Sequence, residues 1–156
     1  MVTFDAKILT VSESVSLGTR EDRSGEELAA SLALHGFRVV ERRVVPDGVQ
    51  PVAAALRDLS SSFAGLVVTT GGTGFSPNDL TPEATRSVVE REAPGMAEAM
   101  RAVNPLGRLS RGLAGAVGQC LVLNLPGSPK GAVESLEAVI DVLPHALELL
   151  TGGSPH

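Results

Sequence analysis

The sequence predicts an α/β fold with a mostly parallel central sheet, because β-branched runs alternate with segments of helical apolar spacing. The clearest strand is the continuous run 66–70, which is typical of a strand buried on both faces of a parallel sheet. It leads into a glycine-rich loop at 71–74 and then into a helix, with Thr81 as N-cap and Pro82 at the first helical position. In such sheets ligands gather beyond the carboxyl ends of the strands, so this succession also indicates where a site should lie.

The length of 156 residues fits a single domain, residues 1–156, in which 151–156 form a short polar tail. The net charge of −5 argues against a nucleic-acid binder, which would normally carry a basic stripe. No apolar run is long enough for a bilayer, and the first residues lack the pattern of a signal peptide, so we expect a cytoplasmic protein. The single cysteine, Cys120, excludes an intrachain disulfide and is expected to be a buried core thiol.

The first half of the chain predicts two strands around one helix. Residues 7–12 form the first β-like run. Ser24 and Glu27 have the spacing of a capping box and open a helix that stops at His35, with Gly36 beyond its end. Residues 37–45 then alternate apolar and charged side chains, which indicates a strand near the edge of the sheet.

The second half predicts further helices and a hairpin. Apolar residues at helical spacing mark a helix over 52–63, and after the strand 66–70 we expect helices over 82–92 and from Pro94 onward. A break at 104–107 precedes a β-hairpin, and a single long helix with an apolar stripe closes the fold. The hairpin arms are 113–117 and 120–125, and the stripe of the last helix runs over 133–150.

Four polar loops leave the carboxyl ends of the predicted strands, at 12–14, 46–47, 71–79 and 126–130. Two of them run directly into helices, so each presents backbone N–H groups to an anion. The glycines in 71–74 favour φ > 0 and a concave arrangement of N–H groups that suits a phosphate, although a plain tight turn explains the same residues. Lys130 is equally consistent with an anion neighbour and with a solvated lysine.

Asp47 and Asp79 stand on two of these loops, and two carboxylates together with phosphate oxygens fit a Mg²⁺ site. The glycine spacing matches neither a Walker A loop nor a dinucleotide fingerprint. No nucleophile elbow is present, whereas phosphoryl and nucleotidyl transfer can rely on positioning and a metal ion alone. The residues therefore predict a metal-assisted enzyme that binds a polyphosphate, without naming the acceptor.

The motifs also resemble a known family. They are Thr10-Val11-Ser12-Glu13-Ser14, Val45-Pro46-Asp47, the stretch from Thr70-Gly71-Gly72-Thr73-Gly74 through Asp79 to Thr85, Leu109-Ser110-Arg111, and Asn124-Leu125-Pro126-Gly127-Ser128-Pro129. In this order and spacing they are similar to the molybdopterin adenylyltransferase family, called MogA in bacteria, with the related MoaB proteins and the G domain of gephyrin. The resemblance covers nearly the whole chain.

The resemblance implies a three-layer α/β/α domain that transfers AMP from Mg-ATP to the terminal phosphate of molybdopterin and releases pyrophosphate. It assigns catalysis and Mg²⁺ binding to Asp47 and Asp79, and pterin contacts to Ser12 and Ser110. It also implies a homotrimer or a hexamer, with a molybdenum insertase as a possible downstream partner. The residues that it assigns to the nucleotide phosphates are Gly71, Gly72, Thr73, Gly74, Pro126, Gly127 and Ser128.

Two other functions stay open at this point. A MoaB-type relative could bind the pterin without adenylylating it, although the presence of both aspartates favours activity. A scaffold, as the gephyrin comparison suggests, is disfavoured because the sequence shows no linker and no long exposed apolar segment. The segment 101–108 and Lys130 receive no role from the resemblance.

Overall fold

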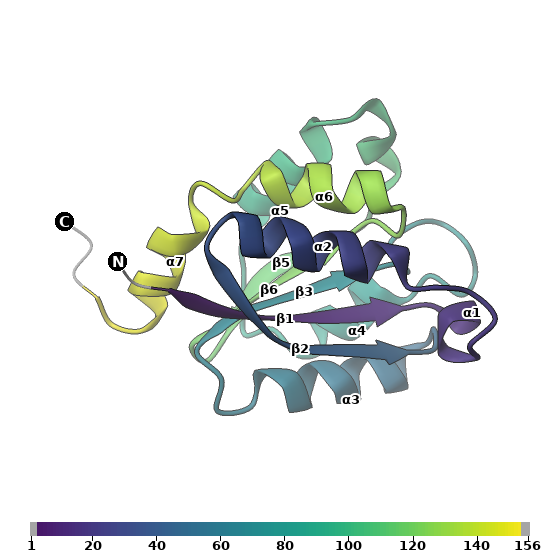
Figure 1. The fold of residues 1–156 in the computed structure, drawn as a ribbon, viewed down its shortest axis with the longest axis horizontal. Coiled ribbons are helices and arrows are strands. Elements are labelled where there is room, and N and C mark those ends of the chain that lie inside the picture. The colour runs from purple at the N-terminus through teal and green to yellow at the C-terminus, as the bar shows by residue number, and fades with distance from the viewer. Residues whose placement is uncertain (1–2, 154–156) are drawn as a thin grey trace.

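A six-stranded sheet forms the middle layer of the computed structural model, which describes residues 3–153 (Figure 1). Its strand order is β2-β1-β3-β6-β5-β4. The first four strands in this order are mutually parallel. At one side of the sheet β5 pairs antiparallel with β6, and β4 pairs antiparallel with β5. The strands are β1 (Phe4–Val11), β2 (Phe37–Val45), β3 (Gly65–Thr70), β4 (Arg91–Glu92), β5 (Ala114–Val117) and β6 (Cys120–Leu125).

The strand patterns account for these positions. Every residue of β3 is buried, as its continuous apolar run predicts for a central strand. Strand β2 alternates buried or half-buried with exposed residues and lies at the edge, which confirms that prediction. The hairpin is confirmed too: Val117 pairs with Cys120, and Gly118 turns the chain with φ +56°.

Helices cover both faces of the sheet, which confirms the layered α/β architecture (Figure 1). One apolar core, formed around Ile8, Val68 and Leu123, lies beneath the first helical layer. A second core, around Leu9, Val67 and Val122, lies beneath the other. The first layer contains α2 (Arg23–Leu34), α5 (Pro94–Ala102), α6 (Pro129–Glu137) and α7 (Leu143–Leu150), and the second contains α3 (Val49–Ser60) and α4 (Thr81–Arg86).

Two predicted helix starts are wrong in detail. The N-cap of α2 is Asp22, not Ser24, and its carboxylate accepts the Gly25 N–H at 3.0 Å. Thr81 is the first residue of α4 rather than its N-cap. The hydroxyl of Thr81 instead donates to the Gly71 carbonyl at 2.9 Å, so it fastens the glycine loop to the helix.

The structure also divides two predicted helices. Helix α4 ends at Arg86 instead of continuing to residue 92, because Glu90 and Ala93 donate backbone N–H groups to strand β5. The long last helix is wrong: it breaks between α6 and α7, where Pro144 lies in the first turn of α7. Proline lacks an N–H and its ring clashes with the carbonyl four residues earlier, so the apolar stripe runs over two helices.

Two short segments appear where loops were predicted. Helix α1 (Glu13–Ser16) follows β1, and a 3₁₀ turn, η1 (Pro105–Leu109), fills the break after α5. Of the predicted polar tail, residues 154–156 lie outside the described part of the chain. No helix within residues 3–153 has the length and apolarity needed to cross a membrane.

Candidate active site

The four loops predicted to form the site meet at one edge of the sheet, where β1, β2, β3 and β6 end in parallel. Hydrogen bonds join them in pairs. The Ser12 N–H donates to Val45, the Gly71 N–H donates to Leu125, and the Thr70 hydroxyl donates to the Pro126 carbonyl at 2.7 Å. The strand ends therefore form one continuous rim.

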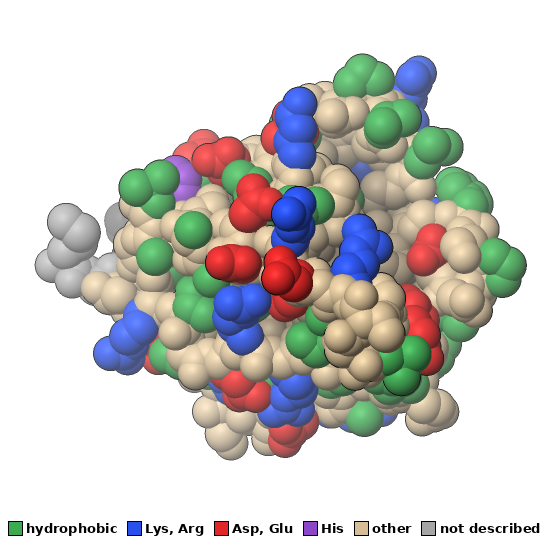
Figure 2. Space-filling view, turned by 45° about the vertical axis from the view of Figure 1, so that its right-hand side comes forward, with side chains coloured by type: hydrophobic (Ala, Val, Ile, Leu, Met, Phe, Trp, Pro, Cys, Tyr) green, Lys and Arg blue, Asp and Glu red, His purple; other side chains and the backbone are tan. Residues whose placement is uncertain are grey.

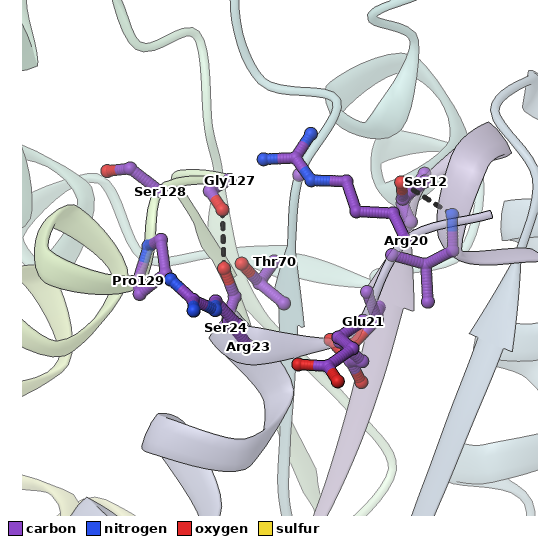
Figure 3. Close-up of a pocket in the computed structure, with 14 residues that line it drawn as sticks. Ser12, Arg20, Glu21, Arg23, Ser24, Thr70, Gly127, Ser128 and Pro129 are labelled. Carbon is purple, nitrogen blue, oxygen red and sulfur yellow. Dashed lines mark hydrogen bonds between the residues drawn. The ribbon is translucent and has the colours of Figure 1, made fainter. Parts of the chain in front are cut away.

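A cleft of about 650 Å³ opens on this rim, on the side of α2 and α6 (Figure 3). Its walls come from the ends of β1 and β3, the loop before α2 and the turn before α6. Of the residues predicted to bind ligands, Ser12, Gly71, Gly127 and Ser128 line it. The remaining lining residues are Thr10, Val11, Val15, Arg20, Glu21, Asp22, Arg23, Ser24, Thr70 and Pro129.

Charged side chains stand at the mouth of the cleft. Arg20 extends toward the turn at Gly127, with Arg23 and Glu21 on the neighbouring wall (Figure 3). Ser24 donates to the Gly127 carbonyl and so ties α2 to that turn. Arg20 and Glu21 come from the loop before α2, and Arg23 and Ser24 from the first turn of α2. Neither segment has a recognisable ligand-binding pattern in the sequence.

The glycine loop confirms two of its three expected left-handed positions. Gly71 and Gly72 have φ of +103° and +70°, whereas Gly74 does not have a positive φ. At Gly74 the constraint is space, since an added Cβ would lie 3.0 Å from the Asp79 carboxylate. Within residues 3–153, the N–H groups of Gly72, Thr73 and Gly74 donate to no other protein group. Such N–H groups suit an anion.

Asp47 and Asp79 lie close enough for their charges to interact, but neither lines the cleft. Asp47 directly precedes Gly48, the N-cap of α3, and Asp79 precedes Leu80, the N-cap of α4, so each stands just before a helix of the second layer. Burial raises the pKa of Asp47, a hydrogen bond from the Glu13 backbone N–H lowers it, and the charges of Asp79 and Glu13 raise it further.

The donor set fits a magnesium ion that completes its shell with other oxygens. No group of three or more His, Cys, Asp or Glu side chains suited to a metal exists within the described residues. Mg²⁺ is commonly held by one or two carboxylates together with phosphate oxygens and water, which is the number of carboxylates offered by Asp47 and Asp79. A nearby cation would also relieve the repulsion between these two charges.

The two serines expected to contact the pterin lie in different places. Ser12 lines the large cleft and its hydroxyl accepts the Val15 N–H at 3.3 Å, as N-cap of α1. Ser110 lines a separate cavity of about 20 Å³, together with Pro126 and Asn124. Lys130 is exposed in the first turn of α6 and does not line the cleft.

Arg111 is a site residue without a predicted role, although it belongs to the motif Leu109-Ser110-Arg111. Its side chain reaches the glycine loop and the start of α4, with hydrogen bonds to Gly74, Asp79 and Glu83. The sequence feature that could have indicated this role is the arginine next to Ser110. The carbonyls of the exposed 73–79 loop need hydrogen-bond donors from elsewhere in the fold, and an arginine supplies several.

Comparison with known proteins identifies the family of this chain. Residues 7–145 match the family described as a probable molybdopterin binding domain. The molybdopterin adenylyltransferase of Helicobacter pylori strain J99 is 36% identical, with 97% of this chain and 90% of that protein aligned. The MoaB molybdopterin biosynthesis enzyme of Thermus thermophilus superposes with a TM-score of 0.91 at 47% identity, covering 98% of this chain and 99% of that chain.

A third relative is longer. Gephyrin of Dictyostelium discoideum is 35% identical over 92% of this chain, which corresponds to 22% of the gephyrin sequence. The chain belongs to the molybdopterin-binding domain family that includes the MogA and MoaB proteins.

Proposed function

We propose that this protein is a molybdopterin adenylyltransferase that acts in molybdenum cofactor biosynthesis. In the reaction, an oxygen of the terminal phosphate of molybdopterin attacks the α-phosphorus of ATP. The bond between the α- and β-phosphates breaks, pyrophosphate leaves, and AMP stays on the pterin. The observation that carries this proposal is the interacting pair Asp47 and Asp79 next to a glycine loop with N–H groups free for an anion.

Each part of the rim has a task in this reaction. The N–H groups of residues 72–74 bind the phosphates of the nucleotide, while the turn at Gly127 and Ser128 binds phosphate from the other side. Asp47 and Asp79 hold Mg²⁺, which would neutralise negative charge on the transferred group. The acceptor occupies the cleft beside Ser12, where Arg20 and Arg23 offer positive charge to its phosphate.

A second candidate is a MoaB-type protein that binds molybdopterin without transferring AMP. The observation in favour of this candidate is the 47% identity to the MoaB enzyme of Thermus thermophilus. The scaffold reading has weaker support, because the gephyrin match corresponds to 22% of that longer protein.

The proposal extends to assembly and location. Side chains of Val103, Leu106 and Leu109 are exposed around η1, and Figure 2 shows apolar side chains gathered at that end of the molecule. Together with the family, this apolar surface supports a homotrimer, or a hexamer built from it. Light scattering that gives a 16.1 kDa particle at micromolar concentration contradicts the proposed assembly. We place the protein in the cytoplasm, where ATP is available, with a molybdenum insertase receiving the product.

The test is incubation of the purified protein with molybdopterin and Mg-ATP, scored for adenylylated pterin and for pyrophosphate. Reactions without molybdopterin, or with EDTA, are the controls and are expected to release no pyrophosphate. Tight pterin binding without any pyrophosphate would select the MoaB-type candidate instead. Failure to bind either substrate contradicts both candidates.

A further inference from the structure

Arg111 connects the two ends of the exposed loop between the glycines and α4. Its backbone N–H donates to the Thr73 carbonyl at 2.8 Å, and its Nε donates to the Gly74 carbonyl at 2.7 Å. At the far end of the loop, Nη2 donates to the Asp79 carbonyl at 2.6 Å. The side chain therefore fixes the distance between Gly74 and Asp79, while the backbone of Arg111 holds Thr73.

The remaining guanidinium nitrogen makes an ion pair with α4. Nη1 lies 2.6 Å from a carboxylate oxygen of Glu83, and the guanidinium carbon lies 5.7 Å from the centre of the Phe75 ring. The arginine is half-buried, whereas Phe75 is 72% exposed. A planar guanidinium presents its donors in a fixed fork, so these contacts define its orientation.

The loop itself has few other anchors. Residues 75–78 are exposed, and the turn closes on itself through the Ser76 N–H to the Asp79 carboxylate, 3.0 Å, and the Asp79 N–H to the Ser76 carbonyl, 2.9 Å. These two bonds fix the shape of the turn, but they do not attach it to the rest of the protein. Attachment near Asp79 comes from Arg111 and from the Thr81 N–H, which donates to the Gly72 carbonyl at 3.0 Å.

The loop must also resist a repulsion. The negative charges of Asp79 and Asp47 repel each other, and this repulsion favours displacement of the loop. Arg111 opposes that displacement without neutralising the carboxylate, because its hydrogen bond goes to the Asp79 backbone carbonyl and its ion pair goes to Glu83. The Asp79 side chain thereby keeps its charge available for a cation.

We propose that Arg111 is a positioning residue that holds the 73–79 loop at both ends and so keeps Asp79 beside Asp47 for adenylyl transfer. The inference rests on the proposed function for its catalytic half. Its structural half, the attachment of the loop, is independent of any substrate.

The experiment compares R111A and R111K with wild type in two measurements. Hydrogen exchange at the amides of residue 111 and Thr81, which donate to the Thr73 and Gly72 carbonyls, is expected to accelerate at least tenfold in R111A, with the strands unchanged. Single-turnover AMP transfer is expected to fall about a hundredfold at saturating ATP, with molybdopterin affinity unaltered, because the loss lies in positioning. R111K stays at least tenfold below wild type, since a lysine ammonium cannot bind both ends of the loop.

Two controls bracket these variants. R38A removes an exposed ion pair to Asp5, 2.8 Å long, and leaves both measurements unchanged. E83Q removes the ion pair but keeps both loop contacts, so its rate stays within about threefold of wild type. Thermal unfolding shows whether each variant is folded. If R111A does not fold, R111K is used for both measurements instead.

The outcomes separate this inference from the proposed function. Unchanged amide exchange in folded R111A, or full recovery of the rate by R111K, overturns the two-ended attachment. Accelerated exchange with an unchanged transfer rate overturns the positioning role. If wild type itself transfers no AMP, the proposed function fails, while accelerated exchange in R111A still supports the attachment of the loop.

Discussion

The side-chain amide of Asn124 in β6 donates to the hydroxyl of Thr85 in α4 at 2.9 Å, and both residues are buried. The same amide nitrogen reaches Thr69 of β3 at 3.1 Å, and the amide oxygen accepts the Leu113 N–H at 3.0 Å. Thr85 in turn donates to the Thr81 carbonyl, one step from the glycine loop. One polar side chain thus links the sheet core to the helix that carries the site.

Asn124→Leu is expected to lower the free energy of unfolding by roughly 2 to 4 kcal/mol, because the Leu113 N–H would be left buried without an acceptor. Urea denaturation measures the change. The control is Ser31→Ala: the Ser31 hydroxyl oxygen is buried and has no hydrogen-bond partner within the described residues. Removing it should leave stability within about 0.5 kcal/mol or raise it. Equal losses in both variants contradict the role given to Asn124.

Asp47→Asn and Asp79→Asn are each expected to slow AMP transfer about a hundredfold or more while leaving pterin binding largely intact. Asparagine keeps the size of the side chain but removes the charge that holds the cation, and each ~1.4 kcal/mol of lost stabilisation costs a factor of ten. Single-turnover transfer and pterin fluorescence measure the two effects. Asp141→Asn, at an exposed position between α6 and α7, is the control. Near-normal transfer in both site variants rules out the metal assignment.

Gly72→Ala is expected to weaken ATP binding about tenfold. The new Cβ would strain a backbone with φ of +70° and overlap the Thr81 hydroxyl, so the N–H groups of the loop would move. Gly118→Ala is the matched control, since Gly118 also has a positive φ but faces open space. That control should lose roughly 1 kcal/mol of stability and no affinity. Calorimetric titration measures the affinity of both variants for ATP. Equal affinity in the two variants contradicts the assignment of phosphate binding to the glycine loop.

Cys120 is expected to resist alkylation in the folded protein and to react once urea unfolds it. The side chain is fully buried, and burial raises the pKa of its thiol to about 12. Because the folded pKa lies above the unfolded one, the stability linked to this thiol is fully present below about pH 9 and declines as the pH rises toward 12. Iodoacetamide labelling followed by mass spectrometry tests the burial. Rapid labelling under native conditions would show that the thiol is accessible.

Local patterns in the sequence predicted strands β2 and β3 well, since the buried run of β3 and the alternation of β2 depend on neighbours in sequence. The glycine loop and the meeting of four loops at one edge followed from the parallel arrangement. Helix ends were harder to predict. The continuous apolar stripe over 133–150 gave no sign of the break at Pro144. Helix α4 is shorter than predicted because the residues after it pair with strand β5, which is distant in sequence.

The composition of the site was only partly predictable for the same reason. Asp47 and Asp79 could be selected because each stands on a loop that follows a strand. That neither lines the cleft depends on how these loops pack in the folded protein. Arg111 acts on residues more than thirty positions earlier in the chain. Such contacts exist only in the folded protein.

The mixed direction of the sheet has a consequence for how the chain assembles. The β5–β6 hairpin closes a turn of two residues between Val117 and Cys120, whereas pairing β1 with β3 joins residues sixty apart, such as Ala6 and Leu66. The loop-closure entropies differ by about 3 kcal/mol. We therefore expect the hairpin to form early and to offer β6 as the edge on which β3, and then β1 and β2, are laid down. Pulsed hydrogen exchange during refolding should protect Leu121 and Leu123 before Ile8, and the reverse order would exclude this route.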